Sequence, residues 1–215
     1  MNLLAIDTST DYLSLAVMRN GKIASKLHKK APMSHSSLLV PMIDRVMKKA
    51  RLKLGDIDGF CVSIGPGSFT GLRIGVATVK GLACALKKPI VAVPTLDAIA
   101  ENARALKGII CPVLDARKGK VYACLYRSDG KDLKKISKYL LLPTLELKER
   151  LKKHAKDDII FLGDTAEDIF LKDWHPRAEI VAKLGLENFR KKRFVSAGDL
   201  EPFYIYSKEC DIRGI

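Results

Sequence analysis

A short pattern of strands occurs twice in this chain and limits its fold more than any other feature. In the first copy, an apolar strand at 3–6 ends in Asp7, and a second strand follows at 12–18. In the second copy, an apolar strand from 109 ends in Asp115, and a second strand follows at 121–126. Recurrence of such a unit is typical of duplicated folds. We therefore expect two related lobes, with chance similarity of two hairpins as the alternative.

Strands and helices alternate around both copies. An Asn20-Gly21 turn joins the strand at 12–18 to one at 22–28, which completes a β-meander. Apolar spacing predicts helices at 34–49, 69–86, 96–106, from 144, 165–174 and 179–193, and further strands at 59–64, 90–93, 135–142 and 159–163. Alternation of this kind is typical of α/β folds.

The repeat also predicts where the chain divides. We expect an N-terminal lobe at residues 1–108, a shortened C-terminal lobe at 109–195, and a tail at 196–215 that packs back on the N-terminal lobe. A chain of 215 residues is long enough for two compact lobes with substantial cores.

Composition indicates the cellular compartment. No apolar run approaches the roughly 18 residues that a membrane span needs, and the N-terminus lacks the basic start of a signal peptide. We therefore expect a cytoplasmic protein with no membrane contact. The five cysteines are odd in number and form no C-x-x-C pair, so we expect buried, reduced thiols. They are Cys61, Cys84, Cys111, Cys124 and Cys210.

The chain is strongly basic. Its formal net charge is +14 and its pI is near 9.6, which favours a polyanionic partner. The charges form short dispersed runs, such as Arg190–Arg193, so a lysine-rich solvated surface is the alternative. The sequence leaves direct binding of nucleic acid open.

The most unusual segment is the glycine-rich turn at 65–75, which leaves a strand and opens a helix. Free backbone N–H groups at such a turn could bind an anion, but the spacing matches neither the dinucleotide fingerprint nor the P-loop. Close packing is the interpretation that we favour, because small residues recur three or four apart along the helix. They are Gly71, Gly75, Thr78, Gly81 and Ala85.

Four segments together resemble the successive signatures of the TsaB family, also called YeaZ. They are residues 5–10, 34–41, 65–73 and 114–122. The resemblance covers roughly the first 125 residues. It implies an α/β, two-lobe actin-like, Hsp70-like and sugar-kinase-like ATPase fold with a reduced second lobe. Family members commonly end in Pro-x-Tyr-Leu-Arg, whereas residues 202–207 here read Pro-Phe-Tyr-Ile-Tyr-Ser.

The resemblance also implies a function. It predicts a non-catalytic scaffold or activating subunit of the complex that forms N6-threonylcarbamoyladenosine in tRNA. The expected partners are a TsaD-like catalytic subunit, a TsaE-like ATPase, and tRNA reached through the complex, with a homodimer forming when the chain is alone. No cofactor is expected to bind this chain tightly, and ATP or ADP is expected only in the complex.

Candidate nucleotide-binding residues follow from catalytic relatives of this fold, in which a carboxylate after the first strand holds metal and phosphates. The counterparts are Asp7, Thr8, Ser9 and Asp115. Ordinary polar turns are the alternative. The TsaD-like relative resembles a metalloenzyme with two histidines four apart on a helix, and no pair among His28, His35, His154 and His175 has this spacing. We therefore expect no metal site and no catalytic residue.

The apolar helix at 34–49 and the small-residue helix at 69–86 form the expected partner interface. Its residues are His35, Leu38, Leu39, Met42, Ile43, Val46, Gly71, Arg73, Gly75 and Thr78. The alternative is that both helices simply pack on their own sheet. An independent sugar-kinase-type phosphotransferase or ATPase is the rival function, and a metallopeptidase is a further one.

Overall fold

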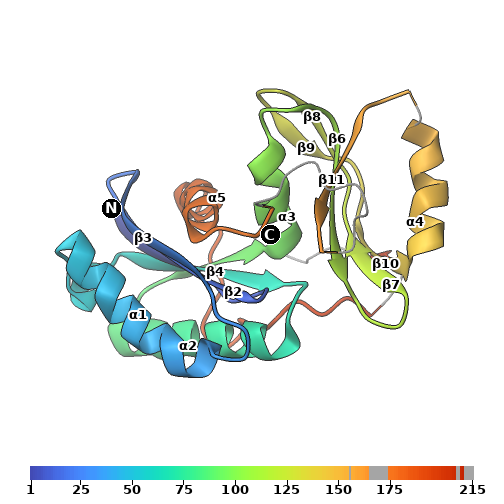
Figure 1. The fold of residues 1–215 in the computed structure, drawn as a ribbon. Coiled ribbons are helices and arrows are strands. Elements are labelled where there is room, and N and C mark those ends of the chain that lie inside the picture. Colours follow the sequence, from blue (N-terminus) through green and yellow to red (C-terminus); the bar gives the residue numbers. More distant parts are fainter. Residues whose placement is uncertain (155, 165–173, 207–208, 211–215) are drawn as a thin grey trace. The chain divides into compact units, whose positions relative to one another are not determined.

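The structure, a computed structural model, describes residues 1–154, 156–164, 174–206 and 209–210 (Figure 1). The chain divides into two compact units. Of the described residues, the first contains Met1–Ala98 and Pro176–Phe203, and the second contains those of Ile99–His175 together with 204–206 and 209–210. Each unit is built around its own β-sheet.

The sheet of the first unit has five strands in the order β3-β2-β1-β4-β5. They are β1 (Asn2–Asp7), β2 (Tyr12–Arg19), β3 (Lys22–Lys30), β4 (Gly59–Gly65) and β5 (Ile90–Pro94). The first three form an antiparallel meander, and β4 and β5 join it in parallel. The turn at Asn20 and Gly21 has positive φ at both positions, as an Asn-Gly sequence favours.

Three helices cover the two faces of this sheet (Figure 1). On one face lie α1 (His35–Ala50) and α2 (Phe69–Leu86), which contact each other, and on the other lies α5 (Ala178–Arg190). Short helical segments complete the unit and its boundary: η1 (Leu54–Asp56), α3 (Thr95–Ala100) and η2 (Glu101–Ala103). Because side chains alternate along a strand, the same five strands supply a buried apolar layer to each face.

The second unit repeats the strand order of the first. Its elements are β6 (Lys107–Asp115), β7 (Lys120–Ala123), β8 (Tyr126–Asp129), β9 (Leu133–Lys135), β10 (Tyr139–Pro143), α4 (Thr144–Leu151), η3 (Lys152–His154), β11 (Ile159–Gly163) and β12 (Glu209–Cys210). The path β10-β7-β6-β11 has the same directions as β3-β2-β1-β4. The duplicated, two-lobe α/β fold is therefore confirmed, and the described part of the second sheet has no counterpart of β5.

Several elements differ from their sequence-based expectations. The strand expected at 121–126 divides into β7 and β8, and β8 folds back to pair with the start of β6. The strand expected at 135–142 begins only at Tyr139, and the helix expected at 96–106 ends early in a 3-10 turn. A helix was also expected at 165–174, but residues 165–173 lie outside the described part of the chain.

The largest difference concerns α5. We expected this helix in a second lobe spanning 109–195, whereas it packs on the sheet of the first unit. Its buried residues Val181 and Ala182 lie in one cluster with Leu3 and Cys61. The chain therefore returns to the first unit at Pro176, not at 196.

Helix α2 also corrects two expectations. With 18 residues and a mean hydropathy of 1.3, it is long and apolar enough to cross a membrane, which the sequence analysis had excluded. A core helix of a soluble protein meets the same test, and α2 buries Leu72, Val76 and Val79. Cys84 on this helix is exposed, whereas Cys61, Cys111 and Cys124 are buried as expected.

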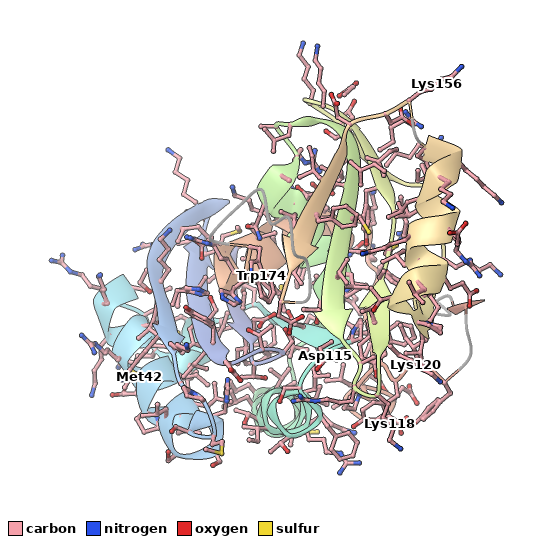
Figure 2. The ribbon with its side chains drawn as sticks, turned by 45° about the vertical axis from the view of Figure 1, so that its right-hand side comes forward. Met42, Asp115, Lys118, Lys120, Lys156 and Trp174 are labelled. Carbon is pink, nitrogen blue, oxygen red and sulfur yellow. The ribbon has the colours of Figure 1, made fainter. Side chains whose placement is uncertain are left out.

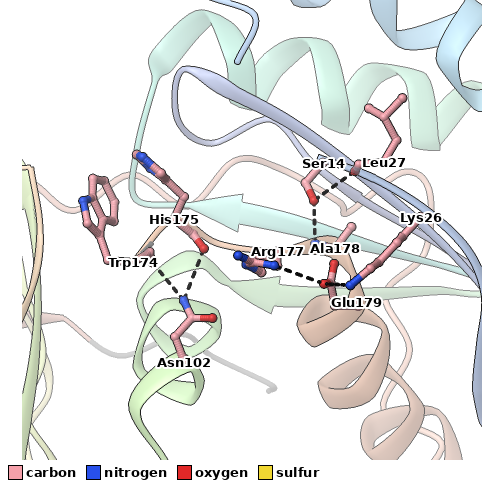
Figure 3. Close-up of polar contacts among 9 residues, drawn as sticks. All are labelled: Ser14, Lys26, Leu27, Asn102, Trp174, His175, Arg177, Ala178 and Glu179. Carbon is pink, nitrogen blue, oxygen red and sulfur yellow. Dashed lines mark hydrogen bonds and ion pairs between the residues drawn. The ribbon is translucent and has the colours of Figure 1, made fainter. Parts of the chain in front are cut away.

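Polar contacts fix the start of α5 (Figure 3). The backbone N–H of Ala178 donates to Ser14 Oγ on β2 at 2.9 Å, and no side chain of the helix itself caps this end. Glu179 forms an ion pair with Lys26 on β3, with 2.7 Å between Lys26 Nζ and Glu179 Oε1. Just before α5, the Asn102 amide donates to the carbonyls of Trp174 and His175 within the second unit. Hydrogen bonds therefore hold the chain both before and after Pro176, the residue at which it returns to the first unit.

Replacing Ser14 with alanine is expected to lower the free energy of unfolding by about 1 kcal/mol, because a buried N–H at the start of α5 would lose its acceptor. Urea denaturation followed by circular dichroism measures this change. Ser36→Ala, at an exposed position of α1, is the control and should leave stability unchanged. Equal stability of both variants would show that Ser14 does not cap α5.

Candidate functional site

The glycine-rich turn lies against the loop between β1 and β2. Ser68 donates its backbone N–H to the carbonyl of Ser9 at 2.7 Å. A Cβ atom at Gly67 would lie only 2.2 Å from the same carbonyl oxygen, so the two backbones approach as closely as glycine permits. The Ser68 N–H of the turn is therefore bonded within the chain.

Thr8 fills the space that the glycines of α2 leave. Its hydroxyl donates to the carbonyl of Gly71 at 2.7 Å. Added Cβ atoms at Gly71 and Gly75 would lie 2.1 Å from Thr8 O and 2.3 Å from Thr8 Oγ1. These glycines thus allow α2 to approach the end of β1. Among the small residues of α2, Gly81 and Ala85 are exposed and Thr78 is half-buried, so no single packing face extends along the helix.

Asp7 is fully buried and its carboxylate is hydrogen-bonded locally. Ser9 donates its backbone N–H at 3.1 Å and its hydroxyl at 3.0 Å to Asp7 Oδ1. Burial raises the pKa of Asp7 from 3.8 to about 6, and the hydrogen bonds from the Ser9 backbone N–H and hydroxyl partly offset this effect. The carboxylate is therefore held at a cost in desolvation, inside the first unit.

Asp115 lies in a different environment in the second unit. It ends β6, accepts the backbone N–H of Arg117 at 2.8 Å and forms an ion pair with the same residue at 3.2 Å. Its own N–H donates to Asp164, which follows the parallel strand β11. Burial raises the pKa of Asp164, and the nearby Asp115 carboxylate adds to the shift. Asp164 was not among the residues predicted from the sequence, although a carboxylate directly after a buried strand is the same pattern that pointed to Asp7 and Asp115.

The four candidate nucleotide-binding residues lie in two different environments. Asp7, Thr8 and Ser9 come together, but they are buried and bonded to one another or to α2. Asp115 is partly exposed and paired with a cation. In this structure the polar groups of Asp7, Thr8 and Ser9 are bonded within the chain and present no surface to a phosphate. A nucleotide role for these residues stays a prediction.

The candidate interface residues divide into two groups. His35, Leu39, Ile43 and Val46 are buried, as are Gly71 and Gly75, so they pack within the first unit. His35 Nε2 lies 3.3 Å from the carbonyl oxygen of Tyr12. Leu38, Met42, Arg73 and Thr78 keep partly or fully exposed side chains on α1 and α2, and Figure 2 labels Met42.

Two exposed apolar residues on the same helices were missed by the sequence analysis. Val40 on α1 is 62% exposed and Phe69 at the start of α2 is 54% exposed. The guanidinium of Arg73 lies 3.6 Å from the centroid of the Phe69 ring, a cation–π contact. Helical periodicity assigned the core stripe correctly, but it does not identify apolar residues that lie outside that stripe.

Two further observations concern metal and charge. Within residues 1–154, 156–164 and 174–206, no group of three or more His, Cys, Asp or Glu side chains could hold a metal ion. Arg190–Arg193 are exposed at the C-terminal end of α5, where the helix dipole favours cations. A contact between these four residues and tRNA stays a prediction.

Comparison with known proteins connects the whole chain to tRNA modification proteins. The family described as "TsaD: tRNA N6-adenosine threonylcarbamoyltransferase" matches residues 26–172. The tRNA threonylcarbamoyladenosine biosynthesis protein TsaB of Bacillus subtilis is 31% identical over 235 residues, which cover 100% of this chain and 98% of that protein. A tRNA N6-adenosine threonylcarbamoyltransferase of Prosthecochloris aestuarii is 32% identical over 46% of this chain and 32% of that enzyme.

A solved structure agrees with this result. YeaZ from Pseudomonas aeruginosa superposes with a TM-score of 0.78 at 26% sequence identity, covering 95% of this chain and 99% of that one. The resemblance thus extends beyond the first 125 residues, and the expected two-lobe α/β fold is that of YeaZ.

Proposed function

The chain belongs to the TsaB family of tRNA threonylcarbamoyladenosine biosynthesis proteins, and we propose that it is a non-catalytic subunit that binds and activates a TsaD-like catalytic subunit. In this proposal, the pair acts in the cytoplasm with a TsaE-like ATPase, and tRNA is bound by the complex. ATP or ADP belongs to the complex and not to this chain alone.

The exposed apolar surface of α1 and α2 is the observation that carries the proposal. Val40 on α1 and Phe69 on α2 are largely exposed, and Leu38 and Met42 on α1 are half-buried. Aromatic and methionine side chains are enriched in protein interfaces, and arginine is enriched among the residues that contribute most of the binding energy. We call Leu38, Val40, Met42, Phe69 and Arg73 the helix-pair surface.

The partner's relationship to this chain supports the choice of this surface. The threonylcarbamoyltransferase relative matches 46% of this chain, so a catalytic subunit of that kind has a related lobe. Two related lobes that meet through the same helices form a pseudo-symmetric four-helix contact. In the absence of that partner, the same surface would pair with a second copy of this chain, which gives a homodimer.

The interior of the first unit supports a non-catalytic role. Asp7, Thr8 and Ser9 have their polar groups bonded within the chain, so the buried Asp7 carboxylate is not available to a substrate. This arrangement gives no support to an independent phosphotransferase or ATPase.

The test is reconstitution with the TsaD-like subunit, the TsaE-like ATPase, ATP and tRNA. Val40→Glu should weaken binding of the catalytic subunit at least tenfold, because a charge would be buried in an apolar contact. Modified tRNA should fall at low protein concentration and recover at high concentration. Leu145→Glu is the matched control, since Leu145 is 77% exposed on α4 of the second unit.

Two outcomes contradict the proposal in different ways. If the wild-type chain gives no more modified tRNA than its partners give without it, the proposed function is wrong. If Val40→Glu and Phe69→Glu bind the partner as tightly as Leu145→Glu does, the interface lies elsewhere. Gly75→Leu is unsuitable for this test because Gly75 contacts Thr8 inside the unit.

A further inference from the structure

Three tyrosines of the second unit lie close together. Tyr122 is on β7, and Tyr204 and Tyr206 belong to the segment that re-enters the unit after Phe203. The rings of Tyr204 and Tyr206 are 6.1 Å apart and tilted by 56°. Burial raises the pKa of Tyr122, and the Tyr206 phenol adds to the effect. The strand that follows this segment, β12, pairs with β10, and β10 pairs with Tyr122 at Leu141, so the segment leads into the same sheet. Tyr206 is 86% exposed.

The hairpin between β6 and β7 presents three cations next to Tyr122. Arg117, Lys118 and Lys120 are all exposed, and Figure 2 shows Lys118 and Lys120 at the tip of the hairpin. Lys120 and Tyr122 are two residues apart on one strand, so they share a face of the sheet. One cation, Lys120, and an aromatic ring therefore project from the same short strand, and the other two cations lie in the turn before it.

The hairpin is held in one conformation by four hydrogen bonds. Ala116 donates to Lys120 and Lys120 donates to Arg117 across the turn. Asp115 accepts from Arg117, and Thr144 at the start of α4 donates to Gly119. Arg117 and Lys118 both adopt left-handed φ values, 67° and 53°. Long side chains rarely occupy this region, and residues held there cluster at binding sites.

We propose that Arg117, Lys118, Lys120, Tyr122, Tyr204 and Tyr206 form a surface that binds single-stranded RNA directly. The phosphates contact the cations of the hairpin, and an unpaired base stacks on Tyr206. We call these six residues the tyrosine–hairpin surface. The choice of RNA over other polyanions rests on the proposed function, in which the substrate is a tRNA.

The chemistry favours single-stranded over duplex RNA. Stacking requires a base whose face is free, and bases in a duplex are covered by their neighbours. Proteins that bind single strands combine aromatic platforms with a basic track, and the sequence preference of such sites is low. Both components are present on this surface, whereas Arg190–Arg193 belong to the first unit, where the adjacent Phe194 ring packs edge-on against Phe189.

The test measures binding of a fluorescently labelled RNA stem-loop to the full chain, without partners, by anisotropy. The control ligand is a continuous RNA duplex of equal length. Tyr206→Leu should weaken stem-loop binding about tenfold and leave duplex binding unchanged, because one stacking contact is lost. Tyr206→Phe should bind as the wild type does, since it keeps the ring.

Charge variants test the second component. Lys120→Gln and Lys118→Asn should each lower the slope of log affinity against log salt by about 0.7, the value for one phosphate contact in a single strand. Lys153→Gln, at an exposed position of η3, removes the same charge and should leave the slope unchanged.

The outcomes separate this inference from the proposed function. If Tyr206→Leu binds the stem-loop as the wild type does, or loses duplex binding equally, the surface is wrong even if reconstituted tRNA modification succeeds. If polyglutamate binds with the same dependence on Tyr206 and Lys120, the surface binds acidic proteins and the RNA assignment is overturned. Stem-loop binding without stimulated modification would instead contradict the proposed function alone.

Discussion

Replacing Gly75 with alanine is expected to lower the free energy of unfolding by about 2 kcal/mol, although alanine is the better helix former. The added Cβ would lie 2.3 Å from Thr8 Oγ1, and that hydroxyl is fixed by its bond to Gly71. Overpacking of this kind costs typically about 1–3 kcal/mol, which exceeds the gain in helix propensity of up to about 1 kcal/mol. Urea denaturation followed by circular dichroism measures the change.

Two further variants identify the cause. In a Thr8→Ala background the nearest remaining atom is Cβ at 3.5 Å, so Gly75→Ala should there be neutral or stabilising. Gly81, on the exposed side of α2, has no atom within 4 Å, so Gly81→Ala should stabilise by roughly 0.5–1 kcal/mol. If Gly75→Ala and Gly81→Ala have the same effect, the contact with Thr8 is not tight.

The glycines of α2 show what the sequence could and could not predict. Small residues three or four apart in the sequence predicted that one side of the helix at 69–86 allows close packing. The structure contains this helix at the expected residues. Spacing alone cannot show which of them faces the interior, because the neighbour that decides is distant in sequence. Thr8 lies 63 residues from Gly71, so the expectation of one partner-facing stripe failed at Gly71 and Gly75.

Helix α5 shows the same limit at a larger scale. Its apolar periodicity predicted a helix, but an apolar face can pack on either sheet. Placement depends on fit: a Cβ at Gly185 would lie 2.2 Å from the Cys61 thiol on β4, so this glycine lets α5 approach the first sheet. Capping by Ser14 adds a second contact that no local pattern shows. The duplicated strands were predictable because their alternation and terminal carboxylates are local features.

Replacing Asp7 with asparagine is expected to stabilise the protein at pH 7.5 by roughly 2–3 kcal/mol. Burial raises the pKa of Asp7 from 3.8 to about 6, and a tenfold change in proton affinity corresponds to about 1.4 kcal/mol. Between these two pKa values the folded state holds more protons than the unfolded state. The stability of the wild type therefore falls as the pH rises through this window. Asparagine is neutral throughout, and its carbonyl oxygen can still accept from Ser9.

Denaturation with urea at several pH values between about 3.5 and 7.5 measures this effect. The advantage of Asp7→Asn should be nearly absent at the acid end and complete above the folded pKa near 6. Ser9→Ala should have the opposite effect on the pKa of Asp7 from the wild-type hydroxyl: that hydroxyl lowers the pKa, and removing it should raise the pKa further. Without that donor the loss of stability should extend to higher pH. An identical dependence on pH in the wild type and Asp7→Asn would mean that Asp7 is not the buried group that titrates in this window.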